Sequence, residues 1–268
     1  MSSVPETLHY RVSMVQPTVS VCMASYNGER YIKEQLVSIL SQLSADDEVI
    51  VVDDASTDQT RERIAAICDS RVRLLVNHKN RGVLASFERA LLNSAGDIIF
   101  FSDQDDVWKP EKVSTVLDTF LGNPKVTVVT SDSTIIDENG RVVADSYYAT
   151  RSPFTTGIVA NIVHFRYQGC SMALRRTIFP DILPFPHGFN VLHDIWIGLR
   201  NSLAGHKIMY LNQSLFQYRR HSFNASYTLP KSRQIRVRTH LIIALLVDAI
   251  RRAATHLLSS LSRRRQTG

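Results

Sequence analysis

The chain has 268 residues, of which 44% are hydrophobic and 21% are charged. A chain of this length buries a large core without staples, and this composition excludes a wholly disordered or collagen-like chain and a protein with many membrane spans. The three cysteines form no CxxC pair, which argues against a disulfide framework or a structural zinc site. We therefore expect a soluble, folded protein of a reducing compartment.

The net charge of +6 is unevenly distributed along the chain. From Lys231 to the C-terminus, nine lysines and arginines stand against the single acid Asp248, so this segment carries +8 and the first 230 residues carry −2. The basic character therefore belongs to the C-terminal segment. Because no zinc-finger, RRM or KH signature accompanies it, we expect no nucleic-acid partner.

Apolar runs alternate with helical patterns in the first part of the chain. Strands are predicted at residues 19–24, 48–52, 72–76 and 97–101, and helices at 29–43, 56–67 and 84–94. This alternation predicts an α/β fold with an open, mostly parallel sheet and helices on both faces. In such sheets ligands bind at the carboxyl ends of the strands.

After Asp106 the pattern becomes mixed. Helices are predicted at residues 110–120 and 193–204, strands at 126–130, 169–174, 208–211 and 215–218, and a hairpin that pairs 135–136 with 142–143. Residues 145–165 show weak periodicity, and we expect a mobile region there.

Two of the predicted strands end in aspartates, Asp53-Asp54 and the Asp103-Gln104-Asp105-Asp106 run. The chain has no Gly-rich phosphate loop, so a bound nucleotide would need a divalent cation held by carboxylates. Asp103 and Asp105 form a DxD pattern, and alternate residues of an extended segment face the same side. The structural alternative is that these acids only cap turns and helices.

These stretches, in this order, resemble the family 2 glycosyltransferases, which have the GT-A fold. The resemblance covers roughly residues 18–226 and rests on the stretches 25–29, 51–58, 80–82, 96–106 and 169–170. The run His193-Asp194-Ile195-Trp196, with residues 218–221 and Asn224, is similar to the rhamnosyltransferase-like branch. The resemblance divides the chain into an N-terminal extension (1–17), a catalytic domain (18–226) and a basic helical tail (227–268). Within the domain it implies a nucleotide-binding half at about 18–110 and an acceptor half at about 111–226.

The resemblance also implies a nucleotide and metal site. It places the base of the nucleotide on Asp54 and the ribose or metal on Asp103, and the remaining nucleotide contacts fall to Ser25, Tyr26 and Glu29. A divalent cation, Mg²⁺ or Mn²⁺, would be held by Asp105 and His221, although a lone histidine is often structural. Arg219 and Arg220 would face the diphosphate.

The acceptor half carries the candidate base. Inverting transfer needs a carboxylate that takes the proton of the acceptor hydroxyl, and Asp194 holds this position in the resemblance. His193 would shape the pKa of Asp194 or contact the sugar, and Gly169 and Cys170 would line the sugar pocket. Trp196 is a sugar-stacking candidate or a core residue, and Asp194 has the alternative role of a helix cap. Glu138 and Asp145 are the next candidates for the base.

The implied activity is an inverting, metal-dependent glycosyltransferase of the hexosyltransferase class. It would move a sugar, rhamnose from dTDP-rhamnose in this branch or a sugar from a UDP-sugar, to a growing bacterial cell-surface polysaccharide or a lipid-linked oligosaccharide. The alternatives are a nucleotidyltransferase acting on sugar phosphates and a non-catalytic sugar- or lipid-binding scaffold.

The C-terminal tail has the pattern of a cationic amphipathic helix. Its basic and polar side is marked by Arg252, His256 and Arg263, and its apolar stripe by Ile243, Leu246, Val247, Ile250, Ala254, Leu257, Leu258 and Leu261. Such a helix binds an anionic membrane surface, packs on its own domain, or packs on a second subunit. Residues 1–18 show no signal-peptide pattern, so we expect a cytoplasmic protein, peripheral on the inner face of the membrane.

Overall fold

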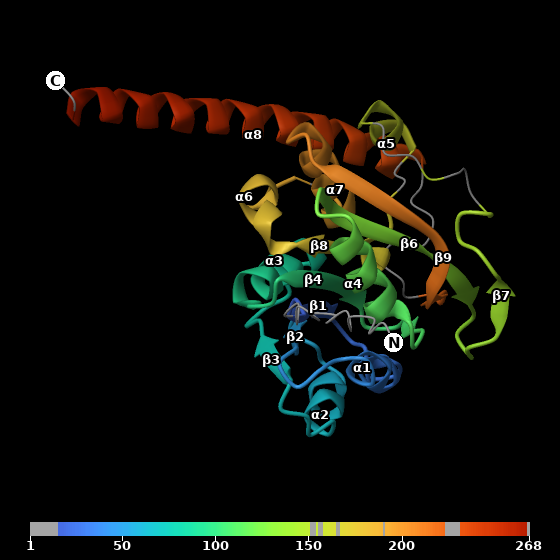
Figure 1. The fold of residues 1–268 in the computed structure, drawn as a ribbon. Coiled ribbons are helices and arrows are strands. Elements are labelled where there is room, and N and C mark those ends of the chain that lie inside the picture. The colour runs from blue at the N-terminus through green and yellow to red at the C-terminus, as the bar shows by residue number, and fades with distance from the viewer. Residues whose placement is uncertain are drawn as a thin grey trace, which may run out of the picture.

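The computed structural model describes residues 16–150, 154, 158–164, 167–189, 191–222 and 231–266 (Figure 1). Residues 1–15 of the predicted N-terminal extension and Asn224 lie outside these ranges.

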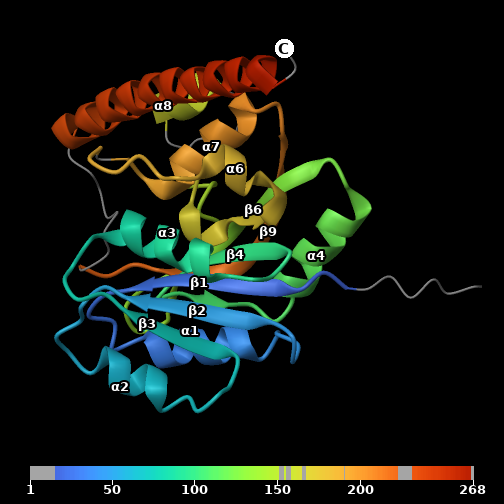
Figure 2. The same ribbon diagram turned by 90° about the vertical axis from the view of Figure 1, so that its left-hand side faces the viewer.

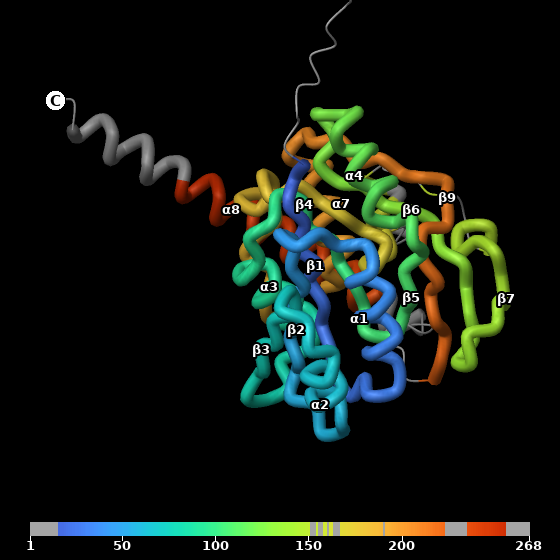
Figure 3. The backbone as a smooth tube through the Cα atoms, turned by 60° about the horizontal axis from the view of Figure 1, so that its bottom comes forward, coloured from blue at the N-terminus to red at the C-terminus, as the bar shows by residue number. Residues whose placement is uncertain are grey.

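Four parallel strands form the first half of one sheet. β1 (Val19–Ser25) lies between β2 (Glu48–Asp53) and β4 (Ile98–Asp103), and β3 (Val72–Val76) pairs with the other edge of β2 (Figure 3). The register places Ser25 opposite Asp53 and Ala24 opposite Asp103. The two acidic strand ends therefore flank the end of β1 at one edge of the sheet, where ligands bind in this class of fold.

Helices cover both faces of these strands, as the alternation predicts. α1 (Ile32–Leu40) and α2 (Thr60–Ala65) pack on one face, and α3 (Val83–Asn93) packs on the other (Figure 2). Successive side chains of a strand point to opposite faces, so Val21 joins the core under α1 while Cys22 joins the core under α3. Burial on both faces explains why the strands are continuous apolar runs.

The second half of the sheet is mixed. The strand order is β3-β2-β1-β4-β8-β6-β9-β5, with β7 beside β6. β8 (Ala173–Arg175) runs antiparallel to β4 and to β6 (Val126–Ile136). β9 (Lys207–Arg219) is parallel to β6 and antiparallel to β5 (Val107–Trp108), and β7 (Val142–Ala144) completes the predicted hairpin with β6.

Several elements differ from the prediction, which has no counterpart of β5 or of the short helix Phe179–Ile182. Residues 208–218 form one strand, β9, because Asn212 and Gln213 are accommodated as a bulge: Leu211 pairs with Ser131, and Ser214 pairs with Asp132. The predicted strand at 169–174 begins as a 3₁₀ turn, Gly169–Ser171, before β8. A helix, α5 (Ile158–His164), lies within the weakly periodic region, 145–165.

The remaining helices are α4 (Lys112–Gly122), α6 (Phe179–Ile182), α7 (His193–Leu203) and α8 (Lys231–Gln266). α8 confirms the predicted helix of the tail and lies across one end of the molecule beside α5 and α7 (Figure 1). It buries Val237, Leu241 and Ala244 against the body. Within the described part of the chain, no helix has both the length and the apolar character needed to cross a membrane.

Candidate active site

The end of β4 is tied to the end of β1 by Gln104, the central residue of the DxD pattern. Its side-chain amide donates to the Tyr26 carbonyl at 3.0 Å and accepts from the Tyr26 backbone N–H at 2.9 Å. The amide lies so close to Gly28 that a Cβ there would be 2.2 Å from Oε1. The sequence analysis gave Gln104 no role. A side-chain amide can both donate and accept, so it can make both hydrogen bonds to the Tyr26 backbone.

The structure brings the predicted metal ligands Asp105 and His221 together. The His221 Nε2 atom and the Asp105 Oδ2 atom are 2.8 Å apart, and both side chains are largely buried. The His221 ring stacks on Tyr31 at a centroid distance of 5.2 Å. A converging carboxylate oxygen and imidazole nitrogen suit Mg²⁺ or Mn²⁺, so these two residues fit the cation that the resemblance implies.

Arg219 fixes the loop that carries Asp105 and Asp106. Its guanidinium donates to the Asp105 carbonyl at 2.8 Å and to Glu34 at 2.7 Å, and its backbone N–H donates to Asp106 at 3.0 Å. Only 2% of Arg219 is exposed. This guanidinium is therefore engaged in fixing the loop, and Arg220, which is partly exposed, is the better candidate for a diphosphate contact.

Beside the loop lies a cluster of the partly buried Asp103 with the buried Asp106 and Cys170, whose potential ligand atoms all lie within 4.8 Å of one another. Burial raises the pKa of Asp106 and of the Cys170 thiol, and burial and the charges of Asp105 and Asp194 raise the pKa of Asp103 to about 7. A protonated thiol is a poor ligand for a hard cation. The donor set with Asp105 and His221 therefore fits Mg²⁺ or Mn²⁺ better than this cluster does.

Lys112 supplies a buried positive charge that the sequence did not single out. Its Nζ donates to the Cys170 carbonyl at 2.9 Å and lies 4.2 Å from the Trp108 ring centroid and 4.4 Å from that of Phe216. Burial lowers the pKa of Lys112 to about 8. The lysine thus fixes the 3₁₀ turn that carries Cys170, next to the buried acids.

Asp54 organises the loop after β3. Its carboxylate accepts hydrogen bonds from the Asn77 side chain at 2.7 Å, the Arg81 N–H at 2.9 Å and the Gly82 N–H at 2.7 Å. Gly82 has a φ of +85°, a conformation that favours glycine. Asp54 lies beside Ser25 at the sheet edge, because its backbone N–H donates to the Ser25 carbonyl at 2.7 Å.

The other predicted nucleotide contacts have different surroundings. Tyr26 is 45% exposed at the site, whereas Ser25 is buried and its hydroxyl has no hydrogen-bond partner among the described residues. Glu29 accepts from the Gln59 N–H at 2.9 Å, at the start of α2. Ser25 and Tyr26 thus lie where a nucleotide can meet them, while the carboxylate of Glu29 is engaged in local structure.

Asp54→Ala is expected to weaken binding of UDP or dTDP about tenfold, because a charge-assisted hydrogen bond is lost. The same change should lower the free energy of unfolding by about 1–3 kcal/mol, since the Asn77 amide and the N–H groups of Arg81 and Gly82 each lose a short hydrogen bond to this carboxylate. Calorimetric titration and urea unfolding measure the two effects. Asp118→Ala, at an exposed position on α4, is the control. Unchanged nucleotide affinity in a folded Asp54→Ala variant would contradict the predicted contact.

Asp194 stands in the first turn of α7. Its Oδ1 accepts from the Ile195 N–H at 2.8 Å, and the Gly169 N–H also hydrogen-bonds the carboxylate. Burial nevertheless raises the pKa of Asp194 to about 6, and the Asp194 charge in turn contributes to the raised pKa of Asp103. The residue at the cap position is Leu192. Asp194 is therefore near enough to the acidic strand end for its charge to act on Asp103.

His193 is a neutral packing residue beside Asp194. Its ring lies 4.3 Å from the Phe87 centroid and 5.5 Å from that of Phe101, and burial lowers its pKa to about 3. A Cβ on Gly169 would lie 2.4 Å from His193 Nε2, which explains the glycine. Burial, rather than His193, is the main cause of the raised pKa of Asp194.

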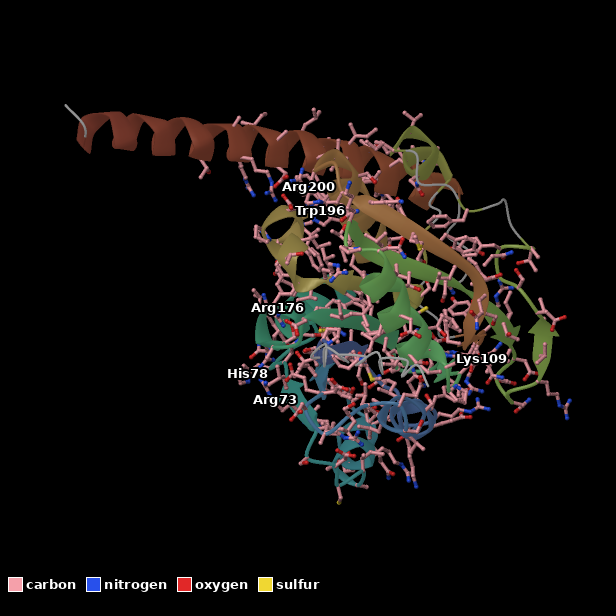
Figure 4. All side chains as sticks on the ribbon, in the orientation of Figure 1. Arg73, His78, Lys109, Arg176, Trp196 and Arg200 are labelled. Atoms are coloured by element: carbon pink, nitrogen blue, oxygen red, sulfur yellow. The ribbon has the colours of Figure 1, made fainter. Side chains whose placement is uncertain are left out.

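Trp196 does not join these residues. It is 1% exposed, lies in the core, and donates its indole N–H to the Ile182 carbonyl at 2.8 Å (Figure 4). Of the two roles considered for Trp196, the core residue is the one that the structure shows. It does not lie with the acidic cluster.

Comparison with known proteins decides the family. The sequence model of glycosyl transferase family 2 matches residues 20–183. The chain belongs to this family. It is 27% identical over 215 residues to an uncharacterized glycosyltransferase of Nostoc sp., a match that covers 77% of this chain and 66% of that protein. The resemblance inferred from the residues is thus confirmed at the level of the family, while its rhamnosyltransferase-like branch stays a prediction.

Two further matches carry named activities or ligands. The Escherichia coli UDP-Glc:alpha-D-GlcNAc-diphosphoundecaprenol beta-1,3-glucosyltransferase is 35% identical over 171 residues, which cover 63% of this chain and 65% of that protein. The structure of S. aureus TarS 1–349 in complex with UDP-GlcNAc superposes with a TM-score of 0.67 at 22% identity, over 85% of this chain and 66% of that one. The fold is therefore shared, and the chain spans less than two thirds of the length of each of these three relatives.

Proposed function

We propose that this protein is an inverting glycosyltransferase with Asp194 as its base. The observation that carries the proposal is Asp194, a partly buried carboxylate at the start of α7 with a pKa raised to about 6, whose charge acts on Asp103 at the acidic strand end. Membership of family 2 favours sugar transfer over the nucleotidyltransferase and scaffold alternatives. In this proposal Asp194 takes the proton of the acceptor hydroxyl, whose oxygen attacks the anomeric carbon as the bond to the diphosphate breaks on the opposite face.

The ends of β1, β2 and β4 are the proposed donor site. Asp54 and Tyr26 would meet the nucleoside, and Asp103 its ribose. Asp105 and His221 would hold a Mg²⁺ or Mn²⁺ ion, which when bound supplies positive charge to the leaving diphosphate. The chain itself orients this site through the Gln104 bonds to Tyr26 and the Arg219 bonds to the acidic loop.

The donor is proposed to be a pyrimidine nucleoside diphosphate sugar, and its acceptor a saccharide or lipid-linked saccharide of the cell surface. A UDP-sugar is favoured because the name of the E. coli relative includes UDP-Glc and the TarS structure is a complex with UDP-GlcNAc. The case for dTDP-rhamnose rests on the resemblance to the rhamnosyltransferase-like branch. A thermal-shift screen of UDP-sugars and dTDP-rhamnose, with and without Mn²⁺, followed by mass spectrometry of products, tests the proposal. Failure of every such donor to bind or to be hydrolysed would refute it.

The rate of transfer is expected to fall as the pH drops through about 6. The raised pKa of Asp194 means that this carboxylate is charged above that pH and protonated below it, and only the charged form accepts a proton. The rate is measured at saturating donor, which separates this titration from effects of Asp103 on donor binding. A profile that is flat from about pH 5 to 8 would contradict the assignment of the base.

We further propose that α8 docks on an anionic membrane surface, where a lipid-linked acceptor is met. The side of α8 turned away from the body exposes Ile235, Ile242, Leu246 and Ile250 at 46–70% of their surface. Arg252, on the opposite side, instead donates to the Asp181 carbonyl at 2.8 Å. An outward apolar stripe on a basic helix is typical of interfacial membrane helices.

The double variant Leu246→Ser, Ile250→Ser is expected to lose at least about tenfold in sedimentation with phosphatidylglycerol vesicles, because two exposed apolar side chains no longer enter the interface. High salt should also release the wild type. Val142→Ser with Val143→Ser, an equally exposed apolar pair on β7, is the matched control. If the wild-type protein does not bind the vesicles and forms a dimer in analytical ultracentrifugation, this stripe contacts a second copy of the chain instead. Deletion of the tail is a poorer test, because Val237, Leu241 and Ala244 belong to the buried core.

A further inference from the structure

A cavity of about 490 Å³ lies between α8 and the segment that joins α6 to α7. Its volume falls within the range of roughly 300–1,000 Å³ that is usual for small-molecule sites. Its walls are mainly apolar and include Leu183, Phe185, Phe189, Trp196 and Val247. Trp196, which the sequence analysis considered as a sugar-stacking residue, therefore lies in the wall of a different cavity.

Of the charged side chains that line the cavity in the described part of the chain, most are paired with protein groups, and one guanidinium is placed to bind a ligand. Asp248 is paired with Arg200 at 3.2 Å and with Arg252 at 2.8 Å, and Arg252 also donates to the Pro180 carbonyl at 2.8 Å. The His187 ring is bonded to Glu88. Arg251 lines the same cavity, is exposed, and has no acidic partner among the residues that the structure describes. The cavity thus combines an apolar interior with a cation at its wall.

Arg251, which lines the cavity, is itself exposed and lies near the outer stripe of α8 along the chain. The preceding residue, Ile250, is 70% exposed on the stripe that we assign to the membrane surface. Among the lining residues, Arg251 is exposed, Val247 is partly exposed and Trp196 is buried, so a ligand whose charged end is on Arg251 would place its apolar end against the other two. A molecule with a phosphate and a hydrocarbon chain matches this order of charge and apolar surface, since guanidinium binds phosphate strongly.

We propose that this cavity binds the hydrocarbon chain of a lipid phosphate, with the phosphate on Arg251, and that the lipid is the isoprenoid carrier of the acceptor. The proposal rests on the lipid-linked acceptor of the proposed function. The cavity lies on the side of α7 that carries Trp196, and Asp194 is two positions away along that helix, a rotation of roughly 200°. The lipid would thus be held behind α7 while the attached saccharide reaches the base.

Calorimetric titration of the full chain with monomeric farnesyl phosphate tests the site. Arg251→Glu is expected to raise the dissociation constant about tenfold or more, because a charge-assisted hydrogen bond is replaced by repulsion. Val247→Phe, which fills the cavity from a partly exposed position, should weaken binding to a similar degree. Arg236→Glu, the same charge change at an exposed position outside the cavity, is the matched control and should change binding less than about twofold.

Three results would overturn the proposal: no binding of farnesyl phosphate by the wild type, binding that neither Arg251→Glu nor Val247→Phe weakens, or equal binding of farnesol. Dihexanoyl phosphatidic acid that binds as tightly as farnesyl phosphate would overturn the choice of an isoprenoid. Donor hydrolysis by the wild type is measured separately. Hydrolysis without farnesyl phosphate binding refutes the lipid site alone, and binding without hydrolysis of any donor refutes the proposed function alone.

Discussion

Asp194→Asn is expected to lower the rate of transfer by about 10²- to 10⁴-fold while the donor still binds with nearly unchanged affinity. Asparagine has almost the same shape and keeps an oxygen that accepts the Ile195 N–H, so α7 and the Gly169 turn should stay in place. What it lacks is a group that takes a proton at neutral pH. Single-turnover kinetics together with calorimetric titration of UDP separate the chemical step from binding.

Glu138→Gln and Asp145→Asn are the matched controls for this prediction, because both remove an exposed carboxylate of the acceptor half. Glu138 is paired with Arg30 at 3.4 Å on the surface. Both controls should keep wild-type rates. If Asp194→Asn is folded and fully active while one of these variants is inactive, the base lies on the other carboxylate.

Asp105→Ala is expected to lower turnover by about 10²-fold or more and to abolish its dependence on Mn²⁺ concentration, because the carboxylate that we propose holds the cation is removed. The fold should persist, since Asp105 lies in a loop and its main buried partner is His221. Turnover against Mn²⁺ concentration, with circular dichroism as the test of folding, gives the result.

The outcome that would refute the metal proposal is full wild-type activity in excess chelator. His221→Ala should reproduce a weaker form of the same defect, because one of the two proposed ligands remains. Asp118→Ala removes an exposed carboxylate of α4 that is not part of the proposed site, and it should leave the response to Mn²⁺ unchanged. Equal loss in all three variants would indicate a general effect of charge rather than a metal site.

Local patterns predicted the elements that position the donor site. The apolar runs that end at Asp53 and Asp103 are strands β2 and β4, and the predicted hairpin forms between β6 and β7, with Ile136 opposite Val142 and Ile135 opposite Ala144 instead of Val143. Prediction was weakest where pairing between distant segments sets the conformation. The turn at Gly169 is one such place, because the His193 ring from α7 occupies the space of a side chain there.

The contacts within the site could not be predicted from local sequence patterns either. Asp105 meets His221 across 116 positions of sequence, and Lys112 reaches the Cys170 carbonyl across 58. A lysine at the start of a helix has the sequence signature of a surface residue, yet Lys112 is fully buried. Its position follows from the packing of Trp108 and Phe216 around the ammonium group, which no periodicity encodes.

Neighbouring residues alone indicated the family, the alternation of strands and helices, and the acids at the strand ends, because strand burial and helix periodicity are local patterns. The orientation of α8 about its own axis, by contrast, depends on contacts between distant segments. Periodicity shows that a helix has two unlike sides but not which side meets the body. The carbonyls of Pro180 and Asp181 accept the Arg252 guanidinium, and the resulting orientation leaves Leu246 and Ile250 exposed on the outside.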